Sequence, residues 1–236
     1  MRIALYKIRQ KIKKKVNLAV NNLFQNNRAY NKYVFSKIYK KDLFNSRSGN
    51  DNPVSKSGSG SDIEQTREII QALPRLFKKY NIKSILDAPC GDFYWMQHVQ
   101  LDGIDYLGGD IVPEIIYKNK NNYATNTIKF CELDIVNDPL PKVDLIICRD
   151  LLVHLKNPQI IAALNNIKKS GSKYLLTTSF KNTTQNADND SIGFWRPINI
   201  QLTPFNLTNP IDEIFENCTE ANGRYNDKFI LLFQIN

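Results

Sequence analysis

Short apolar runs that end in polar residues recur through the middle of the chain. The first of them, Ile85 and Leu86, follows a polar stretch and stops at Asp87. Runs of this length are typical of strands that are buried on both faces of a parallel sheet. The strands predicted in this way occupy residues 84–87, 106–110, 127–133, 143–148 and 174–178.

Segments with helical periodicity separate several of these strands. Ser61 and Glu64 match a capping box, and the amphipathic stretch after them predicts a helix that ends near Lys79. A second helix is predicted over residues 158–169. The aromatic and apolar side chains of residues 93–96 begin a pattern that fits a further helix packed on the sheet.

The end of the chain has a different pattern. Two apolar segments, 211–218 and 229–235, flank the dipeptide Asn222-Gly223, which is typical of a turn between antiparallel strands. Strands that alternate with helices and finish in such a pair predict an α/β fold. We expect a Rossmann-like, doubly wound, mostly parallel sheet of seven strands with an antiparallel C-terminal strand.

The turn after the first strand, residues 87–92 (DAPCGD), is the first candidate for chemistry. Gly91 permits an unusual backbone dihedral or the close approach of a ligand. A strand, a turn with glycine and a helix N-terminus together form a cradle for a small polar ligand. We therefore expect the function of the chain to depend on this turn.

Acidic residues also follow the next three predicted strands. Asp110 ends the second strand, 23 residues after Asp87, and Asp134 and Asp150 follow the third and the fourth. The carboxyl ends of parallel strands meet at one edge of the sheet, where folds of this kind bind ligands. These side chains are therefore expected to lie close together.

With this turn and this order of acids, roughly residues 62–236 resemble the class I S-adenosylmethionine-dependent methyltransferases. The resemblance implies S-adenosylmethionine as the cofactor. It places the first loop around the methionine part, the second acid on the ribose, and the third acid with its apolar neighbour beside the adenine. The cofactor-binding residues that it implies are Asp87, Ala88, Pro89, Cys90, Gly91, Asp110, Ile111, Asp134, Ile135 and Arg149.

Other classes fit the sequence less well. The loop departs from the resembled family in one respect, since it has one glycine where that family usually has two or three. It also lacks the G-x-G-x-x-G fingerprint of dinucleotide-binding oxidoreductases, which disfavours that class. A pyrophosphate would also face Asp87 and Asp92. The segment at 149–152 lacks the motif of N6-adenine methyltransferases, and no cysteine stands where a cytosine-C5 enzyme needs its nucleophile. Nucleic-acid substrates are therefore disfavoured.

The segment after the fourth strand, RDLLVHL, contains the candidate catalytic residues Asp150 and His154. Methyl transfer to an alcohol benefits from a base that takes the hydroxyl proton and from accurate positioning. Histidine titrates near neutrality, whereas an aspartate would need a raised pKa to act as the base. We predict that the pair orients and deprotonates the acceptor. The alternative is that Asp150 caps a turn and His154 is a packed polar residue.

Trp195 and Arg196 are the candidates for holding the acceptor, by stacking and by hydrogen bonds to oxygen, with a purely structural clasp as the alternative. The segments RDLLVHL and GFWRPINIQLTPFNL are similar to a group of small bacterial and viral methyltransferases, which implies a glycan acceptor. We expect O-methylation of a sugar hydroxyl on a polysaccharide or glycolipid, without a metal ion. Small-molecule or protein methylation and a non-catalytic scaffold are the alternatives.

Charge divides the chain. Residues 1–41 contain 12 Lys or Arg and no acidic residue, whereas the remainder contains 20 basic and 23 acidic residues. We interpret residues 1–44 as a basic helical extension, which packs on the domain or contacts an anionic membrane surface, a partner enzyme or nucleic acid. The apolar residues at helical spacing in this extension are Ile8, Ile12, Val16, Val20 and Phe24.

Residues 45–61 are rich in Gly, Ser, Asn and Pro, which predicts either a flexible linker or a lid over the cofactor, ahead of a methyltransferase domain at 62–236. The four cysteines form no C-x-x-C pair, and the sequence shows neither a secretory signal nor an apolar span long enough for a bilayer. The expected location is cytoplasmic, at most peripheral at the inner face of a membrane.

Overall fold

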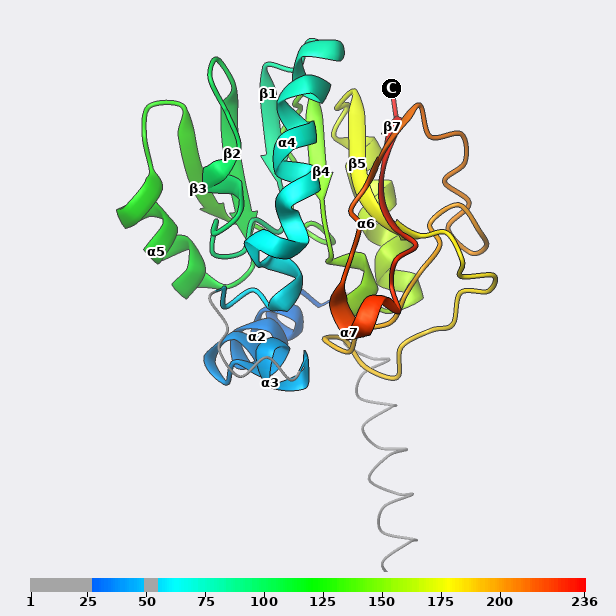
Figure 1. Cartoon of the computed structure of the whole chain (residues 1–236). Helices are drawn as coiled ribbons and strands as arrows, with labels where there is room; N and C mark the ends of the chain where they lie inside the picture. The colour runs from blue at the N-terminus through cyan, green and yellow to red at the C-terminus, as the bar shows by residue number, and fades with distance from the viewer. Residues whose placement is uncertain (1–26, 49–54) are drawn as a thin grey trace, which may run out of the picture.

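The fold is built on one sheet of seven strands. The computed structural model describes residues 27–48 and 55–236, so the apolar series from Ile8 to Phe24 lies outside the described residues. The strands are ordered β3-β2-β1-β4-β5-β7-β6, and β7 alone runs antiparallel to its neighbours (Figure 1). The strands are β1 (Ser84–Asp87), β2 (Asp105–Asp110), β3 (Ile128–Glu132), β4 (Leu145–Cys148), β5 (Tyr174–Phe180), β6 (Asp212–Phe215) and β7 (Lys228–Gln234). The predicted fold class is confirmed.

Helices cover both faces of this sheet and its carboxyl edge. Two of them, α2 and α3, lie beneath the carboxyl ends of the parallel strands (Figure 1). Among the described residues, no helix has the length and apolar composition needed to cross a membrane. The helices are α2 (Arg28–Lys40), α3 (Leu43–Ser48), α4 (Ile63–Lys79), α5 (Pro113–Tyr123), α6 (Asn157–Lys169) and α7 (Glu220–Gly223).

The alternation of side chains along the strands produces two cores. Ile85 of β1 packs with Ile69 and Leu73 of α4 on one face, while Leu86 packs with Ile160 of α6 on the other. All five side chains are fully buried. Each such side chain contributes about 1.5–3 kcal/mol through removal of its apolar surface from water. The two cores therefore fix the strand ends that carry the polar residues.

Two predicted helix features are wrong. Residues 93–96 do not begin an α-helix, because Phe93 has a φ of +60° and its ring packs edge-on against Phe130 in the core. Only a short 3-10 turn, Met96–His98, follows. The capping box at Ser61 is also absent, because Ser61 belongs to the 3-10 turn Ser59–Ser61 and Asp62 is the N-cap of α4.

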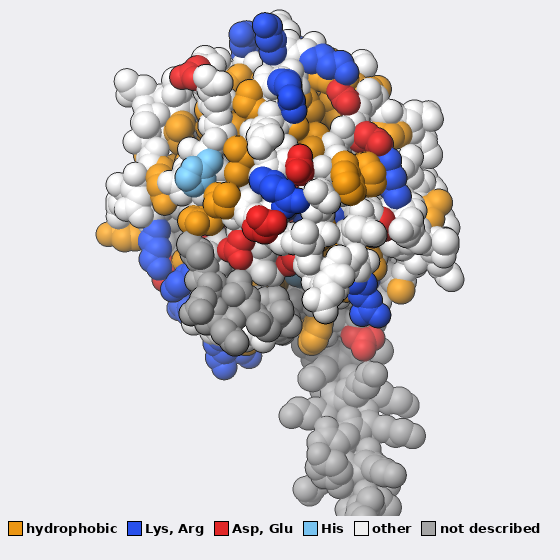
Figure 2. All heavy atoms as spheres, in the orientation of Figure 1, with side chains coloured by type: hydrophobic (Ala, Val, Ile, Leu, Met, Phe, Trp, Pro, Cys, Tyr) orange, Lys and Arg blue, Asp and Glu red, His pale blue; other side chains and the backbone are white. Residues whose placement is uncertain are grey.

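The surface bears on the predicted partners. On the face shown in Figure 2, basic, acidic and hydrophobic side chains are interspersed, and neither charge gathers into a single field. A duplex or single strand of nucleic acid is usually met by a continuous basic stripe. This face does not have one.

Candidate active site

A cavity of about 920 Å³ lies at the carboxyl edge of the sheet. Its walls come from the loops after β1, β2, β3 and β4, from residues 56–62, from α2, and from the 193–195 and 218–228 segments. Cavities that bind small ligands and cofactors measure about 300–1,000 Å³. The strand-end residues predicted to lie together do line this cavity, with the exception of Asp87.

The loop after β1 approaches residues 55–61 closely at Gly91. This glycine has a φ of +52°, and a Cβ added to it would lie 2.3 Å from the Ser57 Oγ. No other residue could adopt this conformation and leave Ser57 in place. The single glycine of the loop therefore stands where the backbone requires it.

Asp92 holds residues 55–57 against this loop. Its carboxylate accepts hydrogen bonds from the Ser55 Oγ at 3.0 Å, the Ser57 Oγ at 3.1 Å and the Lys56 amide at 2.8 Å. The Asp92 amide donates in turn to the Ser57 Oγ at 2.9 Å. Residues 56–61 thus form one wall of the cavity, as a lid would.

The two acids that end β1 and β2 occupy different environments. Asp87 is buried beneath the loop, where the Tyr106 hydroxyl donates to its Oδ2 at 2.7 Å, and it does not line the cavity. Burial raises the pKa of Asp87 to about 7, an effect that the Tyr106 bond and the charge of Arg149 oppose. Its predicted contact with the cofactor is therefore indirect, through the loop that it supports.

Asp110 faces the cavity from the end of β2. The Val112 amide donates to its Oδ1 at 2.9 Å and the Gly91 amide donates to its Oδ2 at 3.3 Å, so the carboxylate is fixed but keeps free acceptor positions. Burial raises the pKa of Asp110 to about 6, against these two hydrogen bonds. Ile111 lines the cavity beside it.

The loop after β3 meets helix α2. Asp134 accepts hydrogen bonds from the Val136 amide at 2.9 Å and from the Asn31 Nδ2 at 3.1 Å. The Gln159 Nε2 donates to the Asn31 Oδ1 at 2.9 Å, so Asn31 joins α2 to both Asp134 and α6. Ile135 adds an apolar wall. The predicted adenine side is thus completed by an N-terminal helix residue, Asn31, that the sequence did not indicate.

Four charged side chains, three of them buried and Asp150 partly exposed, close the wall at the end of β4. Asp150 Oδ2 lies 2.6 Å from the Lys228 Nζ and 3.2 Å from the Arg149 Nη1. Glu216 completes a ring, with Oε1 at 2.6 Å from the Arg149 Nε and Oε2 at 2.9 Å from the Lys228 Nζ. Arg149 also donates to the Gly60 carbonyl at 2.9 Å. Burial raises the pKa of Asp150, but Arg149 and Lys228 outweigh it and hold this pKa well below the usual range.

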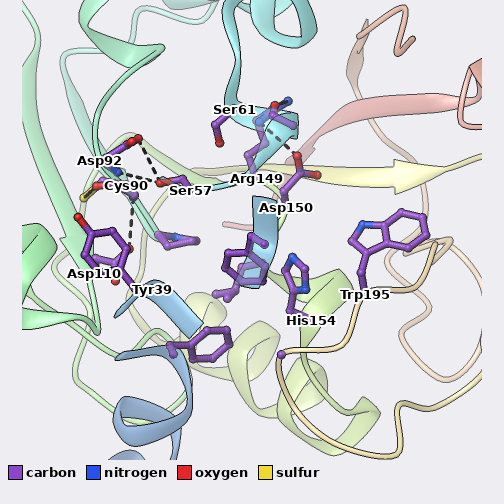
Figure 3. A pocket seen from close by; sticks show the side chains of 18 of the residues that line it. Tyr39, Ser57, Ser61, Cys90, Asp92, Asp110, Arg149, Asp150, His154 and Trp195 are labelled. Carbon is purple, nitrogen blue, oxygen red and sulfur yellow. Dashed lines mark hydrogen bonds and ion pairs between the residues drawn. The ribbon is translucent and has the colours of Figure 1, made fainter. Parts of the chain in front are cut away.

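His154 and Trp195 lie on the same side of the cavity as Asp150, while Asp110, Cys90 and Ser57 lie on the other side (Figure 3). His154 is the last residue of a 3-10 turn, Leu152–His154, and its ring lies 4.6 Å from that of Phe44, between centroids. Asp150 and His154 therefore share the cavity without a common helix.

Aromatic rings form part of the same wall as Asp150 and His154. The Trp195 ring lies 4.6 Å from the Tyr225 ring and packs edge-on against Phe180, at 5.6 Å between centroids. Trp195 keeps 38% of its surface exposed. An indole surface is therefore exposed at the cavity, and its binding of an acceptor stays a prediction.

Arg196 has a different role from the one predicted. Its guanidinium donates to the Leu155 carbonyl at 2.7 Å, the Ala187 carbonyl at 2.7 Å and the Asn157 Oδ1 at 2.7 Å. It is 9% exposed and does not line the cavity. These contacts make Arg196 a structural clasp between two loops, because its donors are already used by the protein.

The pattern of strands did contain a signal for Lys228 and Glu216, which sequence reasoning missed. An antiparallel strand begins at the edge where its parallel neighbours end, so the first residue of β7 reaches the same edge as Asp150. Glu216 follows β6 directly. No comparable signal indicated Asn31, whose position depends on tertiary packing, whereas Ser57 lies in the segment that the sequence predicted as a linker or a lid. Within residues 27–48 and 55–236, no group of three or more His, Cys, Asp or Glu side chains is arranged to hold a metal ion.

Comparisons with known proteins agree with this geometry. A search of curated protein sequences finds no match. Among solved structures, the N-methyltransferase NodS from Bradyrhizobium japonicum WM9, in complex with S-adenosyl-L-homocysteine, is similar over 83% of this chain and 97% of its own, with 17% identity and a TM-score of 0.58. Magnesium protoporphyrin IX methyltransferase from Synechocystis PCC 6803 with bound S-adenosylmethionine covers 92% of this chain and 95% of its own, with 13% identity and a TM-score of 0.50.

At these identities the structural matches establish the fold. The sequence carries the family assignment, since the profile described as a methyltransferase domain matches residues 62–216, which is more than half of the chain. The protein therefore belongs to the methyltransferase domain family.

Proposed function

We propose that this protein transfers a methyl group from S-adenosylmethionine to a hydroxyl of a sugar, on a polysaccharide or glycolipid. One observation carries the proposal: a single cavity joins the loop, ribose and adenine positions around Gly91, Asp110 and Asp134 to a second region with Asp150, His154 and Trp195. A methyltransferase needs both regions in contact, because donor and acceptor must meet in line.

The residues present fit the cofactor. Asp110 presents a fixed carboxylate with free acceptor positions, which suits two ribose hydroxyls. Ile111 and Ile135 supply apolar walls for a planar base, and the backbone at Gly91 permits close approach. When bound, S-adenosylmethionine supplies a methyl group activated by its sulfonium charge.

His154 is the base in this proposal. The acceptor oxygen forms a bond to the methyl carbon as the carbon–sulfur bond breaks, and the hydroxyl proton passes to the His154 imidazole. Asp150 does not take this proton, because Lys228 and Arg149 stabilise its carboxylate. Its role is to accept a hydrogen bond from the acceptor and so to orient it.

Charge and aromatic surface support a neutral, polyhydroxylated acceptor. The two basic side chains beside Asp150, Arg149 and Lys228, are already paired with Asp150 and Glu216, so neither is left to bind a phosphate or carboxylate on the acceptor. The exposed indole of Trp195, backed by Tyr225, offers an apolar surface for the face of a sugar ring.

Two measurements test the proposal in turn. Calorimetry with S-adenosylmethionine should show micromolar binding by the wild type, and Asp110→Ala should abolish it. Release of S-adenosylhomocysteine is then followed with a panel of neutral oligosaccharides and, for comparison, a panel of phenols and peptides.

The same assay examines the catalytic pair. The variants His154→Ala and Asp150→Ala should each lose about a hundredfold or more in turnover while binding the cofactor as the wild type does. Absence of cofactor binding by the wild type would favour a non-catalytic scaffold. Turnover only with phenols or peptides would replace the sugar by a small-molecule or protein acceptor.

A further inference from the structure

We propose that Lys228 is a positioning residue for methyl transfer, which holds the Asp150 carboxylate in the orientation that receives the acceptor hydroxyl. This inference rests on the proposed function, and it concerns a residue far from Asp150 in the sequence. Three features of the structure lead to it: the backbone of Asp150, the division of labour between its two oxygens, and the buried ring of charges.

The backbone of Asp150 is in a sparsely populated conformation. Its φ is +55°, in the left-handed region. Residues held in this way are strained and persist where surrounding groups fix them, which happens most often at functional sites. Here Thr178 of β5 contributes, since its Oγ1 accepts from the Asp150 amide at 2.9 Å and donates to the Asp150 Oδ1 at 3.1 Å.

The two oxygens of Asp150 are used unequally. Oδ2 accepts from the Lys228 Nζ at 2.6 Å and lies 3.2 Å from the Arg149 Nη1, so its acceptor positions are filled. Oδ1 accepts one hydrogen bond, from the Thr178 hydroxyl, and a carboxylate oxygen can accept two. A quarter of the side chain, 25%, is exposed. Oδ1 is therefore the oxygen that can accept from an acceptor hydroxyl.

Lys228 holds the other oxygen of Asp150, Oδ2, from a separate strand. It is the first residue of β7, pairs with Phe180 of β5, and is 3% exposed. Glu216, which is fully buried, holds its Nζ from the other side at 2.9 Å. Lys228 thus has little freedom to move, and it fixes Asp150 Oδ2 relative to the sheet.

Stability alone does not account for this ring of four charged side chains, three of which are buried. Removing an ion from water costs several kcal/mol, and apolar replacements of buried ion pairs are often neutral or stabilising. A ring of two acids and two bases at the wall of the cavity therefore suggests a functional use. That use is a carboxylate of fixed charge and direction beside the reacting hydroxyl.

Other titratable groups also face Asp150. Arg149 is adjacent to Asp150, and His154 lies in the cavity wall. Glu220 of α7 is also near: a Cβ added to Gly60 would lie 3.4 Å from the Glu220 Oε2 and 3.4 Å from the Asp150 Oδ2. Glu220 raises the pKa of a neighbouring acid, whereas Arg149 lowers it. Loss of Lys228 would shift this balance toward protonation of Asp150.

The test uses Lys228→Met and the double variant Lys228→Met/Glu216→Gln. The double variant keeps the ring neutral, since Arg149 and Asp150 remain as a pair, and it guards against unfolding by an uncompensated Glu216. Lys173→Met is the matched control. Lys173 forms an exposed ion pair with Asp144, with 2.8 Å between Nζ and Oδ1, and neither residue lines the cavity. Thermal unfolding reports the fold of each variant.

The first readout is the titration of the Asp150 carboxyl carbon by NMR in the full chain. We expect no titration down to about pH 3 in the wild type and in Lys173→Met, and a measurable upward shift of the midpoint in both Lys228 variants. A folded double variant whose Asp150 titrates as in the wild type would overturn the proposal. This readout does not depend on the donor or the acceptor.

The second readout is turnover against pH with the neutral oligosaccharide that the wild type methylates. The Lys228 variants should lose about ten- to a hundredfold, more at pH 6 than at pH 8, with cofactor binding unchanged. An equal loss at every pH would indicate a structural role and overturn the inference. If the wild type fails to bind cofactor, the proposed function fails, while the NMR titration still decides whether Lys228 holds Asp150.

Discussion

Replacement of Gly91 by alanine measures how tightly the loop after β1 is joined to residues 55–61. The conformation alone, with a φ of +52°, should cost about 1–2 kcal/mol for a residue with a Cβ. The new Cβ would also lie 2.3 Å from the Ser57 Oγ, which cannot stay where it is. The hydrogen bonds that the Ser57 hydroxyl forms with the Asp92 amide and the Asp92 carboxylate would break, at a cost of about 2–4 kcal/mol together.

Gly103 provides the matched control. It also has a positive φ, +71°, but an added Cβ meets nothing within 4 Å. Gly103→Ala should therefore lose only the conformational part, about 1–2 kcal/mol. The assay is the free energy of unfolding from urea denaturation, which should fall by at least about 2 kcal/mol more for Gly91→Ala than for Gly103→Ala.

A second variant separates strain from contact. Ser57→Ala removes the same two hydrogen bonds. The loss of unfolding free energy in the double variant Ser57→Ala/Gly91→Ala should therefore be smaller than the sum of the losses in the two single variants. Cofactor affinity should fall in Gly91→Ala and stay unchanged in Gly103→Ala, because only the first change moves a cavity wall. Equal unfolding free energies for the two alanine variants would refute this account of the loop.

Two further predictions concern the cofactor side of the cavity. The pKa of Asp110 is raised to about 6, and ribose hydroxyls donate to its ionised form. Affinity for S-adenosylmethionine should therefore be constant above pH 7 and fall about tenfold per pH unit below pH 6. In calorimetry, Asp110→Asn should weaken binding and remove this pH dependence. Asn31→Ala should weaken cofactor binding about tenfold or more, because it removes the two side-chain hydrogen bonds that join α2 to Asp134 and to Gln159. Tyr33→Ala, whose side chain is 61% exposed on the same helix, should bind as the wild type does. Equal affinity of the two variants would contradict a role for α2 in the site.

Much of this fold can be predicted from the sequence because local pattern and tertiary environment agree along the strands. The runs at Ile85 and at Leu145 are buried on both faces, as their composition indicates. Asp110 and Asp134 reach the cavity because the parallel strands before them end at the same edge of the sheet. The prediction fails at Phe93, where packing of one aromatic ring in the core overrides helical periodicity. Helical spacing and a buried aromatic cluster are indistinguishable over so few residues.

The assignment of roles to charged residues shows a different limit. The sequence places Asp150 at the strand end and favours His154 as the easier base, but it gives no measure of what surrounds Asp150 and so leaves both a base and an orienting role open for it. Lys228, 78 positions away, contacts the carboxylate at 2.6 Å, and this contact supports the orienting role that we propose. Arg196 illustrates the converse, since a guanidinium beside an indole suggested ligand binding, while the nearby backbone carbonyls of Leu155 and Ala187 had already satisfied it. Candidate chemistry predicted from a sequence is therefore most secure for groups that backbone amides at the strand ends hold in place, as for Asp110. It is least secure for long cationic side chains that several elements can reach.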